Sequence, residues 1–372
     1  MTWTSRQRLI TALDRGVPDR LPVTTHHLMP SFLRQAGLSS ELEFFDRFGL
    51  DAIRWTTPLL RPLEEGGPGW RLEQEDVPTP DYRTTRYRFI TSRGTLTMLL
   101  QDDGRTTWVR ERLLKEKRDL DLLTAITLEP ACDLPAVASA AAGLGERGIV
   151  RGAVPGFPIY GQPGCWQDAA VLFGIEPLIL ATFDDPGWVS SLLSYLQGPK
   201  LAFLRSASGA AFDVVELGGG DASSTVISPA IFDRFVAPFD APLIAAAHAS
   251  GLRVVYHTCG GMMPFLERIA DMRPDAMETF TPPSMGGDTR MAEARRRLGG
   301  RVSMIGGFDQ FNDFVGCPPA QTRQAVRRLF DEAGRDGGYI LAPSDHFFDA
   351  GDDLIRAFAD EARSCAYLPE KI

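Results

Sequence analysis

The stretch from Val254 to Gly261 carries the clearest chemical signal in this sequence. An apolar run typical of a β-strand ends at His257 and Cys259, and two glycines follow. Because alternate residues of an extended segment point to the same side, the imidazole and the thiol face one way. Both groups are ligands that zinc prefers, so the pair would supply half of a four-ligand site. The alternative is structural, since a buried cysteine often serves as a small apolar residue.

The elements that must position this pair form a repeating strand–helix pattern from about residue 148 onward. Helix starts are marked by Asp185-Pro186 and Ser228-Pro229, where a capping side chain precedes a proline. Alternating strands and helices predict a parallel sheet, and the absence of a Gly-x-Gly-x-x-Gly motif disfavours a dinucleotide fold. We therefore predict an α/β fold of the closed (β/α)8 TIM barrel type. The predicted strands are Ile149–Val154, Phe212–Leu217, Leu252–Tyr256, Asp275–Thr279, Val302–Gly306 and Gly338–Leu341.

In such a barrel the catalytic groups lie at the carboxyl ends of the strands. Reactive side chains follow five predicted strands here, at Glu216, His257 with Cys259, Glu278, Asp309, and Asp345 with His346. Each has a structural alternative, such as a cap, an arginine pair or a hydrogen-bonded core histidine. Their placement at successive strand ends predicts that they converge on one pocket.

Two adjacent histidines lie near the start of the chain. A predicted helix over residues 5–16 is broken at Pro18, and an extended segment then runs to His26 and His27. As the end of the first barrel strand, both imidazoles would contact substrate. The other interpretation, that they are ordinary half-buried polar residues, stays open.

An antiparallel excursion is predicted before the main barrel, from about residue 82 to 112. Strand-like alternation over Tyr87–Thr91 and Thr95–Leu100 flanks a Ser-Arg-Gly turn, which is typical of a β-hairpin. No low-complexity linker interrupts the chain. We therefore expect one barrel domain over residues 1–372 with this N-terminal hairpin insertion.

Composition narrows the functional class. A hydrophobic content of 44% and a charged content of 23% are ordinary for a globular protein, whereas a net charge of −9 argues against nucleic-acid binding. The five cysteines are dispersed and odd in number, and no segment is apolar enough for a signal peptide or a membrane span. We expect a cytoplasmic protein with reduced thiols and no membrane partner.

Five stretches carry a family resemblance, namely Ser5–Leu9 through Gly16–Val23, Ile227-Ser228-Pro229, His257–Gly260, Ile305–Asp309 and Gly337–Leu341. They resemble the uroporphyrinogen decarboxylase superfamily, and the resemblance covers most of the chain. True decarboxylases of that superfamily use no cofactor and hold a polycarboxylate tetrapyrrole with arginines of an N-terminal Met-Arg-Gln-Ala-Gly-Arg-Tyr motif. Here Pro22-Val23 is followed by Thr24-Thr25-His26-His27, and many carboxylates would be poorly neutralised.

The resemblance is stronger to the cobalamin-dependent methyltransferase branch, which binds zinc through His-x-Cys and a later cysteine. Related methionine synthases add a glutamate about twenty residues on. The resemblance therefore implies that His257, Cys259 and Glu278 bind zinc. The expected final Pro-Gly-Cys is Pro343-Ser344-Asp345, followed by His346. Either Asp345 or His346 would then replace the missing thiolate, with His346 our predicted ligand, or the site has three protein ligands.

The resemblance implies a zinc-dependent methyltransferase. It would move a methyl group from a small donor, such as a methyl ether, to a corrinoid, or between a corrinoid and a thiol. The cobalamin would sit on a separate carrier protein, and Glu216, Asp309 and Asp345 would orient substrate or protonate the leaving group. Two alternatives stay open, namely a metal-free decarboxylase of a porphyrinogen or smaller acid, and a non-catalytic corrinoid- or tetrapyrrole-binding barrel. Decarboxylase relatives are often dimers, so a homodimer is compatible with the sequence.

Overall fold

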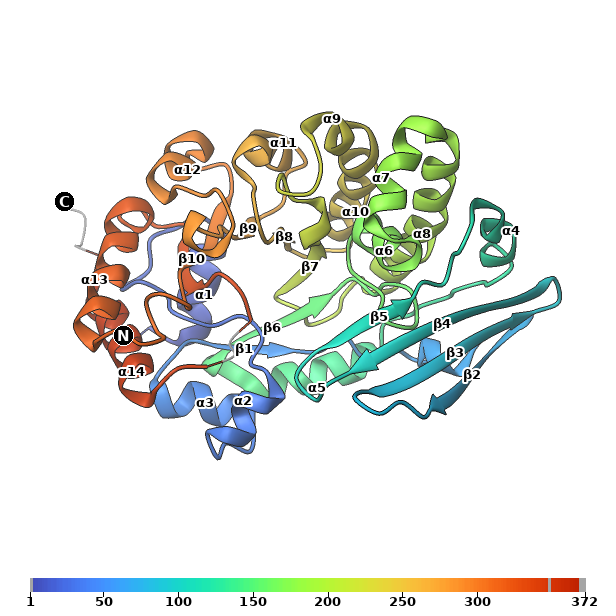
Figure 1. The fold of residues 1–372 in the computed structure, drawn as a ribbon. Helices are drawn as coiled ribbons and strands as arrows, with labels where there is room; N and C mark the ends of the chain where they lie inside the picture. The colour runs from blue at the N-terminus through green and yellow to red at the C-terminus, as the bar shows by residue number, and fades with distance from the viewer. Residues whose placement is uncertain (1–2, 347–348, 368–372) are drawn as a thin grey trace.

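The computed structural model describes residues 3–346 and 349–367, and its centre is a curled parallel sheet (Figure 1). The strands follow one another in chain order and every neighbouring pair is parallel. All six strands predicted after residue 148 are present, with ends displaced by at most two residues. The seven strands are β1 (Ala52–Trp55), β6 (Gly148–Ala153), β7 (Val214–Gly218), β8 (Val254–His257), β9 (Ala276–Thr279), β10 (Ser303–Phe308) and β11 (Tyr339–Pro343).

The sheet has seven strands where the sequence predicts eight in a closed barrel. The extended segment Pro22–Thr24, which we call the bridging segment, lies between the two edge strands and contacts both. Val23 forms a parallel bridge with Leu341 of β11, and its carbonyl accepts a 2.7 Å hydrogen bond from the amide of Asp51, which precedes β1. The segment stays shorter than a regular strand because Pro22 has no amide hydrogen to donate.

Helices cover the outer side of the curled sheet (Figure 1). Strands β7, β9, β10 and β11 are buried along their whole length, as expected when a parallel sheet is covered on both faces. The predicted caps are present, since Asp185 and Ser228 accept hydrogen bonds from the amides of Trp188 and Ile231. The helices are α1 (Ser5–Leu13), α2 (Pro30–Gln35), α3 (Glu41–Phe48), α4 (Leu120–Leu123), α5 (Leu134–Leu144), α6 (Cys165–Phe173), α7 (Ile175–Asp184), α8 (Pro186–Ser206), α9 (Pro229–Ile231), α10 (Ala237–Ala249), α11 (Leu266–Asp271), α12 (Met291–Leu298), α13 (Pro319–Leu329) and α14 (Asp352–Ser364).

A second, four-stranded antiparallel sheet lies beside the curled parallel sheet (Figure 1). It contains β2 (Trp70–Val77), β3 (Arg83–Thr91), β4 (Gly94–Asp102) and β5 (Thr107–Glu111), and β3 pairs with β4 from Thr91 opposite Gly94 onward. The antiparallel region begins at Trp70, so the prediction of a hairpin from about residue 82 was too short. Strand β2 is rich in acidic residues, which are depleted in strands, but Glu75 pairs across the sheet with Arg86 and Arg88.

In the described part of the chain, no helix combines the length and the apolar character that crossing a bilayer requires.

A buried ion-pair cluster fixes the start of the bridging segment. The carboxylate of Asp51 accepts hydrogen bonds from Arg8 at 2.7 Å, from Arg20 at 3.1 Å and from the amide of Val23 at 3.0 Å. Arg8 also bonds Asp19. Because Arg8 belongs to α1, this cluster ties the first helix, the bridging segment and the start of β1 together. The segment that continues to His26 is therefore anchored three residues upstream of it.

We expect Asp51→Asn to lower the free energy of unfolding by about 3–5 kcal/mol, because it removes one partner of a buried ion pair. Asp51 is fully buried. Urea unfolding followed by circular dichroism measures the change. The control, Asp14→Asn, alters a more exposed pair with Arg253 and should cost less than about 1 kcal/mol. Equal effects of the two substitutions would contradict the anchoring role of Asp51.

Candidate active site

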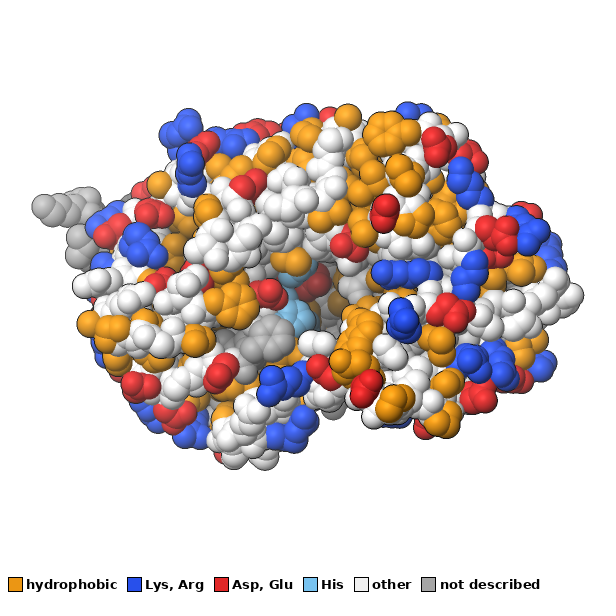
Figure 2. Space-filling view, viewed as in Figure 1, with side chains coloured by type: hydrophobic (Ala, Val, Ile, Leu, Met, Phe, Trp, Pro, Cys, Tyr) orange, Lys and Arg blue, Asp and Glu red, His pale blue; other side chains and the backbone are white. Residues whose placement is uncertain are grey.

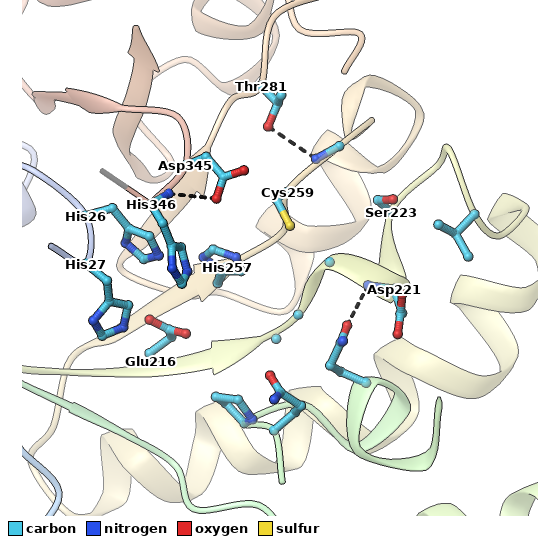
Figure 3. A pocket seen from close by; sticks show the side chains of 18 of the residues that line it. His26, His27, Glu216, Asp221, Ser223, His257, Cys259, Thr281, Asp345 and His346 are labelled. Carbon is cyan, nitrogen blue, oxygen red and sulfur yellow. Dashed lines mark hydrogen bonds between the residues drawn. The ribbon is translucent and has the colours of Figure 1, made fainter. Parts of the chain in front are cut away.

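A cavity of about 640 Å³ opens at the carboxyl ends of the parallel strands. Figure 2 shows the hollow in this face of the molecule, with histidine and acidic side chains at its base. Most of the predicted site residues lie together on its wall (Figure 3), namely His26, His27, Glu216, His257, Cys259, Asp345 and His346. The structure therefore brings residues from both ends of the chain to one place.

His257 and Cys259 stand at the end of β8, as the sequence predicts. The Nδ1 atom of His257 lies 2.8 Å from Oε1 of Glu278, and the Cys259 thiol is hydrogen-bonded to the same imidazole. Gly220, in the loop after β7, gives the thiol its room, because a Cβ at that position would lie 2.5 Å from Sγ of Cys259. Imidazole, thiol and carboxylate thus form one contiguous group.

His26, two residues after the bridging segment, joins this group. Its ring stacks on that of His257 with centroids 5.2 Å apart, and the ligand atoms of His26, His257 and Glu278 all lie within 4.8 Å of one another. His26 was predicted as a substrate contact, whereas the structure places it among residues that could hold a metal ion. His27 stacks on Trp55 at 3.8 Å and lines the cavity.

Arg151, in the middle of β6, lies beneath the site and was missed by the sequence analysis. Its guanidinium donates to Oε2 of Glu216 at 2.6 Å and to both carboxylate oxygens of Glu278, through Nη1 to Oε2 at 2.9 Å. It also lies over the Trp55 ring, 4.2 Å from the centroid. The side chain is only 2% exposed. The signal that could have found it is an arginine inside an otherwise apolar strand, because buried arginines are rare unless paired.

The charges around Glu278 control its ionisation and that of His257. Burial would raise the pKa of Glu278, but the charge of Arg151 and hydrogen bonds from His257 and Arg151 hold it well below its usual range. Burial would lower the pKa of His257, but its hydrogen bond to the accepting carboxylate of Glu278, its contact with Cys259 and the charge of Glu216 raise it well above its usual range. Glu278 is therefore an anion in the folded protein, and His257 is the imidazole that compensates it.

The remaining imidazoles are held neutral. Burial lowers the pKa of His26 well below its usual value, lowers that of His27 to about 3 and lowers that of His346. A neutral imidazole has a free ring nitrogen that can bind a metal ion or accept a proton. The His346 ring is 5.1 Å from that of His26, so both are near the same side of the cavity.

Two loop residues differ from their predicted places. Asp309 does not line the cavity, and its carboxylate accepts hydrogen bonds from the amides of Phe311 and Asn312 and from the hydroxyl of Ser284. Asp309 thus caps the loop after β10 and lies apart from the other predicted site residues, and its catalytic role stays a prediction. Asp221, which the sequence analysis passed over, lies on the cavity wall in the loop after β7.

Comparisons with known proteins relate this chain to one family and one fold. The family model described as Uroporphyrinogen decarboxylase (URO-D) matches residues 101–350. No curated protein matches. A methyltransferase from Methanosarcina mazei has a similar structure, with a TM-score of 0.67 and 16% identity over 98% of this chain and 99% of that chain. A B12-independent methionine synthase from Shewanella sp. W3-18-1 has a TM-score of 0.49 and 10% identity over 93% and 96% of the two chains.

We expect Arg151→Met, studied with a chelator present, to lower the free energy of unfolding by about 3–5 kcal/mol at pH 7.5. The substitution removes the cation that two buried carboxylates share, so their pKa values in the folded state rise above those in the unfolded state. Stability is then lost as pH rises, and the deficit should be larger at pH 7.5 than at pH 5. Urea unfolding at both pH values measures it.

A rescue experiment distinguishes the loss of the Arg151 charge from the loss of its packing contacts. Adding Glu216→Gln and Glu278→Gln to Arg151→Met should recover most of the lost stability, because no buried charge then lacks a partner. The control, Arg88→Met, alters an exposed pair with Glu75 and should have little effect at either pH. A deficit that is independent of pH would contradict the role given to Arg151.

Proposed function

The chain belongs to the uroporphyrinogen decarboxylase family, whose model matches residues 101–350, and within that family we propose that it is a zinc-dependent methyltransferase. It would transfer a methyl group from a small methylated donor to a corrinoid on a separate carrier protein, or between a corrinoid and a thiol. The fold shared with the Methanosarcina mazei methyltransferase over nearly the whole of both chains is compatible with this proposal.

The observation that carries the proposal is the group formed by His26, His257 and Glu278, with Cys259 bonded to His257. Imidazole nitrogen, carboxylate oxygen and cysteine sulfur are the donor types that zinc prefers. The group lies at the base of a cavity, so a substrate could reach it. The residues present therefore fit a zinc ion.

Three ligands of this site would be His257, Cys259 and Glu278. Because the final cysteine expected from the resemblance is absent, the fourth ligand position is open. His26 and His346 are the two candidates for it. Glu278 keeps its charge because Arg151 bonds both of its oxygens. Hydrogen bonds of this kind orient a metal-binding carboxylate.

When bound, zinc would supply a Lewis acid for a leaving oxygen or nitrogen, or would lower the pKa of a thiol acceptor. In the demethylation of an ether, the methyl carbon–oxygen bond breaks, its electron pair stays on oxygen, and that oxygen takes up a proton. His346 lies on the cavity wall, where its neutral imidazole could hold that proton, and Asp345 beside it would orient the donor. Glu216, fixed by Arg151, would orient the donor.

Decarboxylation of a porphyrinogen fits the cavity less well. A polycarboxylate needs cationic partners, and decarboxylation needs a cation beside the developing carbanion. Among the described residues that line the cavity there is no lysine or arginine, and Arg151 beneath it is already bonded to Glu216 and Glu278. A non-catalytic binding protein would leave the convergent imidazoles, thiol and carboxylates without a use.

We expect the purified protein to contain about one zinc ion per chain, the stoichiometry of a single site. His257→Ala and Cys259→Ala should each weaken zinc affinity by more than the roughly 10–100-fold that loss of a ligand's hydrogen-bond partner costs. Elemental analysis gives the content, and competition with a chromophoric chelator gives the affinity.

Matched variants make this test specific. His248→Ala removes a histidine that pairs with Asp275 at the surface, and it should leave zinc content unchanged. A larger loss in His26→Ala than in His346→Ala would assign the fourth ligand to His26, and the reverse would assign it to His346. Protein that contains no zinc after growth with added zinc would contradict the proposed function.

A further inference from the structure

We propose that the methyl donor is a small cation, a methyl ether bearing an ammonium group, whose charge is held by Asp221 and Asp345. This inference rests on the proposed methyl transfer and specifies the class of its donor. The candidate zinc ligands His257 and Glu278 belong to β8 and β9. Asp221 follows β7 and Asp345 follows β11, so the two carboxylates flank the ligands on either side in the strand order (Figure 3).

Apart from the histidines, the charged side chains on the cavity wall have one sign. Glu216, Asp221 and Asp345 all line it, while no lysine or arginine of the described chain does. The imidazole of His257 lies against Glu278, so it does not pair with Asp221 or Asp345. A donor that carries a carboxylate or phosphate would meet only like charge, whereas a cation would be attracted.

The arginines nearest to the wall are already committed. Arg151 bonds Glu216 and Glu278 beneath the cavity. Arg112 lies close enough to lower the pKa of Asp221, but its Nη1 donates to the carbonyl of Val171 at 3.1 Å. Neither arginine can turn the wall positive.

A bound zinc ion would not reverse this sign. The four carboxylates of Glu216, Glu278, Asp221 and Asp345 and a Cys259 thiolate carry more negative charge than one arginine and one divalent cation can balance. Asp221 and Asp345 lie in the loops after β7 and β11, whereas His257 and Glu278 lie on β8 and β9. The methoxy oxygen of the donor would therefore lie at the zinc ligands, and its ammonium group would lie at the carboxylates of the two loops.

Asp221 and Asp345 are the two wall carboxylates that form no ion pair with any residue in the described part of the chain. Burial raises the pKa of Asp221, which shows that its charge is incompletely compensated in the folded protein. An ammonium group would supply the missing partner. Charge-assisted hydrogen bonds of this kind are stronger than neutral ones.

The rest of the wall suits a small, partly apolar molecule. Val226 and Met285 line the cavity beside the hydroxyl groups of Ser223, Thr225 and Thr281. A short aliphatic chain with one charged end would find apolar contact and hydrogen-bonding groups there. Binding sites of this kind combine an apolar lining with a few polar groups that fix orientation.

Three ethers of nearly the same shape test the charge preference. They are 2-methoxyethylamine, which is a cation at neutral pH, 2-methoxyethanol, which is neutral, and methoxyacetate, which is an anion. Ligand-observed NMR titration of the purified full chain compares their affinities. We expect the amine to bind about tenfold more tightly than the alcohol, the usual scale for hydrogen bonds to charged groups, and methoxyacetate to bind most weakly.

Substitutions assign the preference to the two carboxylates. Asp221→Asn and Asp345→Asn should each weaken binding of the amine about tenfold while leaving 2-methoxyethanol unchanged. Asp233→Asn, which alters an exposed pair with Arg268, is the control and should change neither. Failure of the amine to bind, equal or tighter binding of methoxyacetate, or equal weakening of all three ethers by the substitutions would overturn the inference.

The NMR titration and the zinc measurement test the two proposals independently. A charge preference that depends on Asp221 and Asp345 in protein without zinc would support this inference and remove the proposed zinc chemistry. Zinc at the predicted stoichiometry without a charge preference would keep the proposed function and overturn the cationic donor.

Discussion

The rest of the site depends on the buried contact of Arg151 with Glu216 and Glu278. One guanidinium bonds two carboxylates, so the three groups together keep one negative charge in excess inside the barrel. The imidazole of His257 lies against that excess, and its raised pKa is the local response. Because β6, β7 and β9 each contribute one of the three groups, the same contact fixes the spacing of these strands at the level of the cavity. The same interaction therefore positions the candidate ligands and holds the strands beneath the cavity together.

The sequence predicts the parallel strands well because each is a local apolar run followed by a turn, and His257, Cys259 and Glu278 follow from strand-end positions alone. The place of His26 depends instead on contact between a segment near residue 23 and β11, which no local pattern records. Strand β2 was missed because pairing with arginines on β3 compensates its acidic residues. The position of Asp309 outside the cavity lining could not be predicted, because a strand-end position does not tell whether a side chain turns into the cavity or caps its own loop.

Membership in a family fixes the fold of this chain more firmly than its chemistry. The family is named for enzymes that act on a polycarboxylate, yet the wall of this cavity carries acidic side chains and imidazoles. The sign of the charge on the cavity wall therefore distinguishes methyl transfer from decarboxylation of a polycarboxylate more directly than any feature of the backbone does. Because these side chains come from loops after the strands, the barrel can keep its packing while the wall changes.

The bridging segment also has a consequence for the order in which the site is assembled. Val23 is paired with Leu341, which is added more than 300 residues later in synthesis. At typical translation rates of about 5–20 residues per second, the segment waits about 15 to 60 s for this partner. Its sequence after Val23 is Thr-Thr-His-His, which is polar and has little tendency to aggregate while unpaired. The segment thus waits for β11 with polar rather than apolar residues at its carboxyl end.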